Sequence, residues 1–79
     1  MEIIVLGTGC PKCKNLEKTT REVVAEMNIK ANISKEEDIM KIMEYGVMNT
    51  PGLVINDKVA VSGRVPSANE IKELITKNA

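Results

Sequence analysis

Cys10 and Cys13 are the residues of this chain whose type and spacing could do chemistry. Thiolates attack disulfides and bind soft metals, and a spacing of three puts both sulfurs on one side of a helix. The chain has no His, which excludes Ser-His-Asp and Cys-His catalysis and His-ligated metal sites. A bridge between the two sulfurs would close a very short loop and add only about 2 kcal/mol of stability. We therefore interpret the two cysteines as reactive residues and not as a bridge that stabilises the fold.

The position of Cys10 favours a reactive thiolate. The apolar run 3–6 predicts a strand buried on both faces, and Pro11 suits the first position of a helix, so Cys10 is its predicted N-cap. The free N–H groups at that helix end, with Lys12 nearby, favour thiolate over thiol. Cys13 lies one turn further along. We interpret Cys10 as the attacking sulfur and Cys13 as the resolving sulfur in thiol–disulfide exchange.

Short elements must hold this turn in place. Gly7 belongs to the sharp turn between the first strand and the helix, and apolar spacing predicts that the helix ends near residue 27 or 28. Alternation predicts a second strand over 29–33. Ser34 with Glu37 is typical of a capping box and predicts a second helix. We expect that helix to end at Gly46 and to bury four residues, Ile39, Met40, Ile42 and Met43.

The second half of the chain predicts a hairpin and a last helix. Apolar runs at 53–55 and 59–61 flank a polar turn, and Ser67 with Glu70 forms another capping box. The expected inner face of the last helix is Ala68, Ile71, Leu74 and Ile75. The order β-α-β-α-β-β-α predicts one α/β domain over residues 1–79. Its four-stranded mixed sheet has a parallel first pair of strands and three covering helices.

The cysteine spacing alone leaves redox chemistry, metal transfer and an incidental pair open. Two thiolates suit linear Cu(I), and soft-metal chaperones also place Cys-x-x-Cys after their first strand. Those chaperones have the order β-α-β-β-α-β, whereas this sequence ends on a predicted helix. A zinc site needs four ligands, so two chains would have to share one. A redox-sensing interaction domain that uses the same two cysteines is a further alternative.

The motif Thr8-Gly9-Cys10-Pro11-Lys12-Cys13 resembles the active-site motif of the thioredoxin superfamily. Thr50-Pro51 before the hairpin and Gly63 before the last helix extend the resemblance to essentially the whole chain. The sequence is most similar to the small archaeal and bacterial thioredoxin-like redox-active disulfide proteins.

The resemblance implies a thioredoxin-like fold and a protein disulfide oxidoreductase with Cys10 and Cys13 as catalytic residues. It also implies a cis peptide bond before Pro51, with Pro51 beside the sulfurs. Thr50 would then offer its backbone to an extended partner segment, and Gly63 is expected to bind the substrate with Thr50 and Pro51. Three further residues are expected to shape the site or tune the thiolate: Gly9, Pro11 and Lys12.

Three positions depart from the thioredoxin pattern. Gly9 replaces the Trp before the first cysteine, and the proline after that cysteine is more typical of glutaredoxins. Ile4 stands where thioredoxins bury an acid, so water or Lys12 is left to take the proton of Cys13. The segment 62–65 lacks the acid that glutaredoxins use for glutathione.

Composition limits the partners. Eleven basic residues balance eleven acidic ones, so no net charge attracts nucleic acid or an anionic membrane. We expect protein disulfides and an upstream reductase as partners, no cofactor or metal, and a monomer. The N-terminus lacks the features of a signal peptide, which predicts the cytoplasm. Met48, in the loop before Thr50, is a candidate docking residue, whereas Met40 and Met43 are expected in the core.

Overall fold

The predicted order of strands and helices is confirmed. A computed structural model describes residues 1–7 and 11–78. Its elements, in chain order, are β1 (Glu2–Leu6), α1 (Pro11–Glu26), β2 (Asn32–Glu36), α2 (Ile39–Glu44), β3 (Gly52–Ile55), β4 (Lys58–Ser62) and α3 (Ala68–Lys77). None of the helices in the described residues has the length and apolar composition of a membrane-spanning segment.

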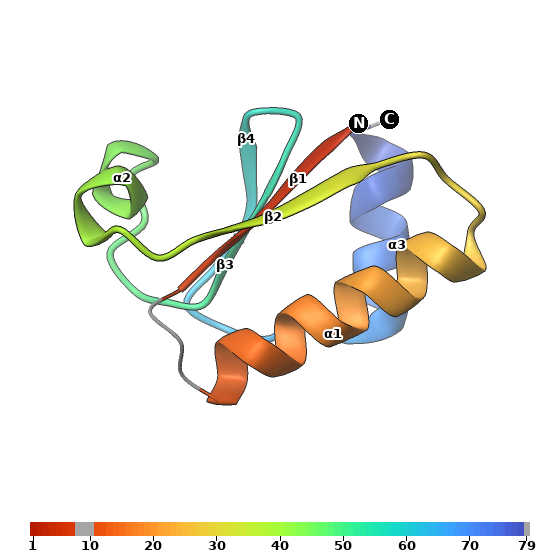
Figure 1. Cartoon of the computed structure of the whole chain (residues 1–79), viewed down its shortest axis with the longest axis horizontal. Helices are drawn as coiled ribbons and strands as arrows, with labels where there is room; N and C mark the ends of the chain where they lie inside the picture. Colours follow the sequence, from red (N-terminus) through yellow and green to blue (C-terminus); the bar gives the residue numbers. More distant parts are fainter. Residues whose placement is uncertain (8–10, 79) are drawn as a thin grey trace.

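One mixed sheet forms the middle layer, in the order β2-β1-β3-β4 (Figure 1). β1 runs parallel to β2, as a right-handed β-α-β unit requires, and antiparallel to β3. β3 and β4 form the predicted hairpin. Asn56 and Asp57 close its turn with φ angles of 49° and 67°, the left-handed values that tight two-residue hairpin turns need.

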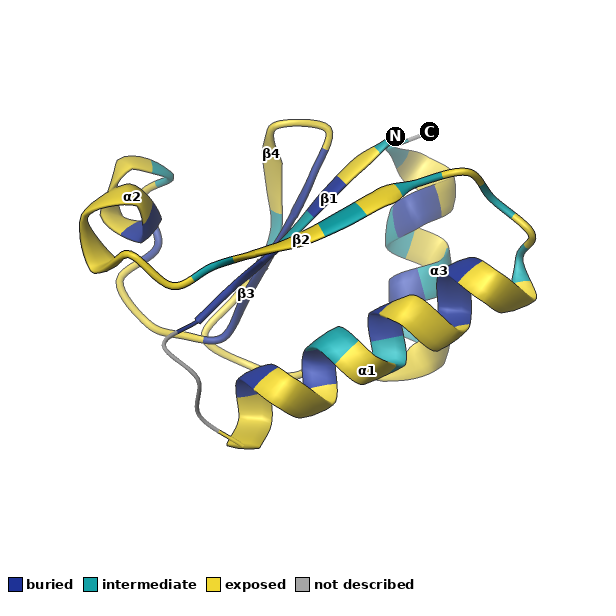
Figure 2. Ribbon diagram, in the orientation of Figure 1, coloured by how far each residue is buried: buried dark blue, intermediate teal, exposed yellow. Residues whose placement is uncertain are grey.

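Each face of the sheet has its own apolar cluster. On one face, Ile3 and Val5 of β1 pack with residues of α1 and α3, including Leu16 and Ile71. On the other face, Leu6 packs with residues of α2, the following loop and β3: Ile42, Val47 and Val54. β1 is therefore covered on both sides, as its continuous apolar run predicts, and the buried stripes of the helices turn toward it (Figure 2).

The predicted bounds of the second strand and the start of the second helix are wrong. α1 ends in a turn in which Asn28 has a φ of 55°. The chain then needs several residues to return to the sheet, so pairing starts at Asn32 and not at residue 29. Ser34 lies inside β2 and is no helix cap. The N-cap of α2 is Asp38, whose side chain accepts a 2.9 Å hydrogen bond from the backbone N–H of Met40.

The predicted burial of α2 is also wrong for three of its four apolar residues. Ile42 is buried, but Ile39, Met40 and Met43 are 58%, 69% and 59% exposed. The helix has only six residues, so it turns a single side chain fully toward the sheet. Gly46 follows it with the expected left-handed φ of 80°.

The start of α3 agrees with the prediction. Ser67 is the N-cap and accepts a 3.2 Å hydrogen bond from the backbone N–H of Glu70. Ile71 and Ile75 are buried, and Leu74 packs against the same cluster. Ala68, the first residue of α3, is exposed instead of lying on the inner face.

Candidate active site

Cys13 packs directly on the end of β1. Its side chain is 5% exposed, and it lies on the buried face of α1. A Cβ atom at Gly7 would lie only 2.8 Å from the Cβ of Cys13 and would overlap its sulfur. Such separations do not occur between real side chains, so the sulfur occupies space that exists because residue 7 is a glycine.

The strand register places Gly7 between two other segments. Leu6 pairs with Glu36 of β2 and with Gly52 of β3, and the Gly7 N–H continues the ladder with a 3.0 Å hydrogen bond to the Glu36 carbonyl. One step further in register, Gly7 has Glu37 on one side and Pro51 on the other. The Cys13 sulfur therefore lies over the end of the inner strand β1.

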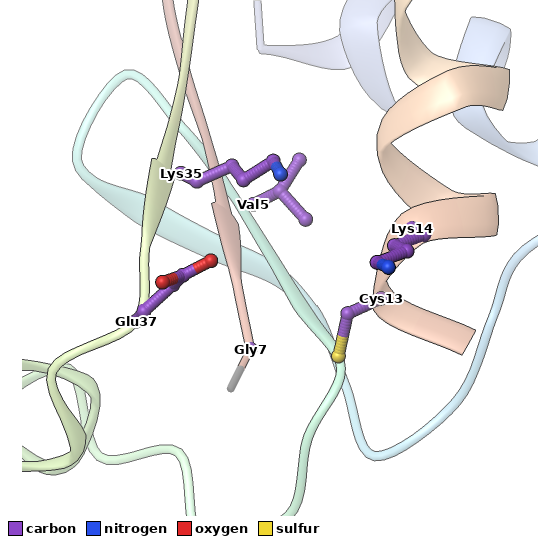
Figure 3. A pocket seen from close by; sticks show the side chains of 6 residues that line it. All are labelled: Val5, Gly7, Cys13, Lys14, Lys35 and Glu37. Carbon is purple, nitrogen blue, oxygen red and sulfur yellow. The ribbon is translucent and has the colours of Figure 1, made fainter. Parts of the chain in front are cut away.

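A narrow cavity opens beside the sulfur (Figure 3). It measures about 10 Å³, close to the smallest space that holds one water molecule. Figure 3 shows Cys13 and Glu37 on opposite sides of Gly7. The lining residues come from β1 and the residue after it, from α1, and from β2 and the residue after it: Val5, Gly7, Cys13, Lys14, Lys35 and Glu37.

An ion-pair network holds one of the lysines at this cavity. The Nζ of Lys35 lies 3.4 Å from Oε2 of Glu17 on α1, and the same oxygen lies 3.8 Å from Nη2 of Arg21. The network ties β2 to α1 on the face that carries Cys13. Among the described residues, no three His, Cys, Asp or Glu side chains gather as they would around a metal ion.

The structure brings two of the predicted partner-binding residues together. The backbone N–H of Gly63 donates a 2.9 Å hydrogen bond to the carbonyl of Pro51. Pro51 is fully buried, and the peptide bond before it is cis, as predicted. Thr50 is exposed immediately before it. Its predicted backbone contact with a partner stays a prediction, as does the packing of Pro51 beside the sulfurs.

The structure describes only some of the remaining motif residues. α1 begins at Pro11, as predicted, and Pro11 and Lys12 are both exposed. Gly9 and Cys10 lie outside the described residues, as does the predicted N-cap interaction of Cys10. Met48, the candidate docking residue, is 88% exposed two positions before Thr50.

The loop after β4 is fastened to α3 by a two-pronged ion pair. Nη1 of Arg64 lies 2.8 Å from Oε1 of Glu70, and Nη2 contacts Oε2. The hydrogen bond from Arg64 lowers the pKa of the Glu70 carboxyl, and the same bond raises the pKa of the Arg64 guanidinium. The pair holds the residue next to Gly63 against the helix.

Comparison with known proteins agrees with this geometry. Residues 1–76 match the family described as "Thioredoxin domain". The chain belongs to the thioredoxin family. A thioredoxin of Methanothermobacter thermautotrophicus is 40% identical over 76 residues, which cover 96% of this chain and 99% of that protein. A thioredoxin of Methanocaldococcus jannaschii is 41% identical over 71 residues, covering 90% and 81%. A probable thioredoxin of Archaeoglobus fulgidus is 34% identical, covering 86% and 77%.

Membership in the thioredoxin family makes the chain a thiol–disulfide oxidoreductase in general terms. The sequence reasoning missed Gly7, Lys35 and Glu37 as neighbours of Cys13. Gly7 could have been found, because a glycine between a buried strand and a cysteine motif marks a close approach. Lys35 and Glu37 were hidden by the misplaced second strand.

Proposed function

We propose that this thioredoxin-family chain exchanges electrons with protein disulfides through a Cys10–Cys13 dithiol and disulfide. The observation that carries the proposal is the buried Cys13 sulfur. It packs on Gly7 at the end of β1, beside the start of β3, which Pro51 precedes. A sulfur in that position is sheltered from solvent, yet it lies on the helix three residues after Cys10. Those features suit a resolving thiol that follows a more reactive one.

The reaction takes place in two exchanges. The Cys10 thiolate attacks one sulfur of the partner disulfide, forming a mixed disulfide and releasing the other partner sulfur as a thiolate. Cys13 loses its proton and attacks the Cys10 sulfur, which releases the second partner sulfur. Two electrons pass to the partner, two protons end on its thiols, and the chain is left with the Cys10–Cys13 disulfide.

The exposed residues Thr50 and Gly63 near Pro51 support a protein as the partner. Thr50 is exposed, and Gly63 is hydrogen-bonded to the Pro51 carbonyl, so an extended segment could pair beside them. Pro11, Lys12 and Gly9 complete the site in this proposal. The segment 62–65 has no acid for glutathione, which favours thioredoxin-like over glutaredoxin-like specificity.

The proposed reaction bears on three further properties: the need for a reductase, the oligomeric state and the location in the cell. An oxidised Cys10–Cys13 pair must be reduced again, so an upstream reductase is required. A single chain carries both sulfurs, so a monomer is sufficient. We place the protein in the cytoplasm, where thiols are kept reduced.

Two serine variants test the roles of the sulfurs. Cys10→Ser should abolish exchange, because a serine hydroxyl is almost wholly protonated near neutral pH. Cys13→Ser should still attack and then stall as a mixed disulfide, since nothing remains to displace the partner. Each variant is mixed with a disulfide-bonded protein and examined by non-reducing electrophoresis.

An adduct with Cys13→Ser and none with Cys10→Ser is the expected result. The reverse pattern would exchange the two roles. No adduct with either variant would reject the mixed-disulfide mechanism.

A further inference from the structure

The second exchange of the proposed function requires a group that accepts the Cys13 proton. Cys13 must lose its proton before it can attack, and the position where thioredoxins bury an acid is Ile4. Ile4 packs against the apolar cluster of Leu6, Ile42 and Val54 on the other face of the sheet. The acid of the thioredoxin pattern is therefore replaced by an apolar side chain on that face.

The cavity beside Cys13 contains a different candidate. Of its described lining side chains, Lys14, Lys35 and Glu37 are charged. A lysine ammonium only donates hydrogen bonds, whereas a glutamate carboxylate accepts them. Lys35 is also paired with Glu17, at 3.4 Å. Glu37 is thus the lining group whose chemistry suits the uptake of a proton.

The pairing of β1 with β2 places Glu37 beside this cavity. The 3.0 Å hydrogen bond from the Gly7 N–H to the Glu36 carbonyl extends the β1–β2 pairing by one residue. Neighbouring strands lie about 4.8 Å apart, so Glu37 stands next to the glycine on which the Cys13 sulfur rests. The cavity between them, about 10 Å³, has room for one bridging water.

We propose that Glu37 accepts the Cys13 proton through a water molecule in this cavity. The proposal rests on the proposed function, because it concerns the second exchange. The water takes the proton from the Cys13 sulfur and gives one to the Glu37 carboxylate. The Cys13 sulfur then bonds to the Cys10 sulfur, the bond to the partner breaks, and the partner thiolate takes a proton from Glu37 or from solvent.

The charge of Glu37 allows the proposal to be separated from a purely electrostatic effect. A carboxylate near a thiol disfavours the thiolate, so removing its charge would by itself increase the thiolate fraction of Cys13. Lys14 and Lys35 act in the opposite direction. Near the cavity, α1 also carries Lys12 and Glu17, and the end of β2 carries Glu36, followed by Asp38. Glu37→Gln therefore slows the second exchange if Glu37 takes the proton, and speeds it if only charge matters.

The test uses the full chain and an aromatic disulfide that releases a coloured thiol. The first release reports attack by Cys10, and the second reports displacement by Cys13, so the two steps are timed separately. For Glu37→Gln near neutral pH, we expect a normal first release and a second release slowed by about tenfold or more. The difference should shrink as pH rises, because hydroxide replaces the missing acceptor.

Two further variants complete the design. Glu37→Asp keeps a carboxylate and should restore part of the rate. Glu36→Gln is the matched control, because it removes the neighbouring charge but keeps an oxygen for its 3.1 Å hydrogen bond from the Asp38 N–H; its releases should be unchanged. An unchanged or faster second release in Glu37→Gln, or equal slowing of both releases, overturns the proposal. A wild-type chain that gives no second release would instead reject the proposed function, and this inference with it.

Discussion

Gly7 shows how much of the site depends on a missing side chain. The Cys13 sulfur lies where a Cβ at residue 7 would be, and Gly7 is flanked in register by the segments that carry Glu37 and Pro51. Its φ lies outside the left-handed region, so an alanine is disfavoured there by overlap alone. Gly46 is the opposite case, with a φ of 80° and no atom within 4 Å of a built Cβ.

These two glycines form a matched pair of alanine variants. Gly7→Ala should push Cys13 away, with a loss of about 1–3 kcal/mol in the free energy of unfolding and a slower second exchange. Gly46→Ala should cost about 1–2 kcal/mol through its backbone conformation alone, with the second exchange unchanged. Urea unfolding and the two-step release of a coloured thiol measure both effects. Equal exchange rates in the two variants would contradict the close contact of Gly7 with Cys13.

At the scale of elements, the sequence predicts the order of the helices and strands better than the residues at which they begin and end. Gly and Pro marked the turns around the cysteine motif, after α2 and on either side of the hairpin, because those residues determine where the chain can turn. Helical apolar spacing indicated α1, and alternation indicated β2. The alternation at 29–33 is real, but alternation does not say where pairing begins, and the return from α1 delays it to Asn32. Because the predicted strand ended at residue 33, Lys35 and Glu37 were not expected beside Cys13. The cysteine motif, Pro51 and Gly63 were accessible because their signals are local, whereas the neighbours of Cys13 depend on strand register.

Helix α2 offers a test of burial within six residues. Ile42 is 2% exposed and Met43 is 59% exposed. Ile42→Ala should therefore lower the free energy of unfolding by about 2–4 kcal/mol, and Met43→Ala by about 0.5 kcal/mol or less. Urea unfolding of both variants measures the difference. A similar cost for the two would mean that α2 packs by a different face.

The ion pair at the start of α3 predicts a pH dependence of stability. The folded-state pKa of Glu70 is lowered from 4.5 by the hydrogen bond from Arg64, so the unfolded chain takes up this proton first as pH falls. The stabilisation is present above pH 4.5 and is lost as pH falls through the lower, folded-state pKa. It should be small, because the pair is exposed.

The variant Glu70→Gln isolates that contribution. Wild type should be more stable than the variant at neutral pH, and the gap in urea midpoint should close in acid. Glu73→Gln, on the same helix, is the control and should show no such closing gap. A gap that stays constant down to strongly acidic pH would contradict the assignment.

At the scale of the whole molecule, the fold uses one strand to serve both stability and chemistry. β1 is buried by an apolar cluster on each face, and its end supports the Cys13 sulfur, the cavity and the segment that begins at Pro51. The helix that carries Cys13 is held to the sheet by Leu16 and Val23 and to β2 by the Glu17–Lys35 ion pair. In the proposed exchange, the resolving sulfur of Cys13 would thus act from a fixed support.

The most direct test of the central claim is the intact mass of the reduced chain before and after reaction with a disulfide-bonded protein, measured in metal-free buffer without reductant. We expect the chain to lose two hydrogen atoms, and peptide mapping to place the new disulfide between Cys10 and Cys13, while the partner gains two thiols. An unchanged mass, with both cysteines still open to alkylation and the partner still oxidised, would contradict the proposed exchange.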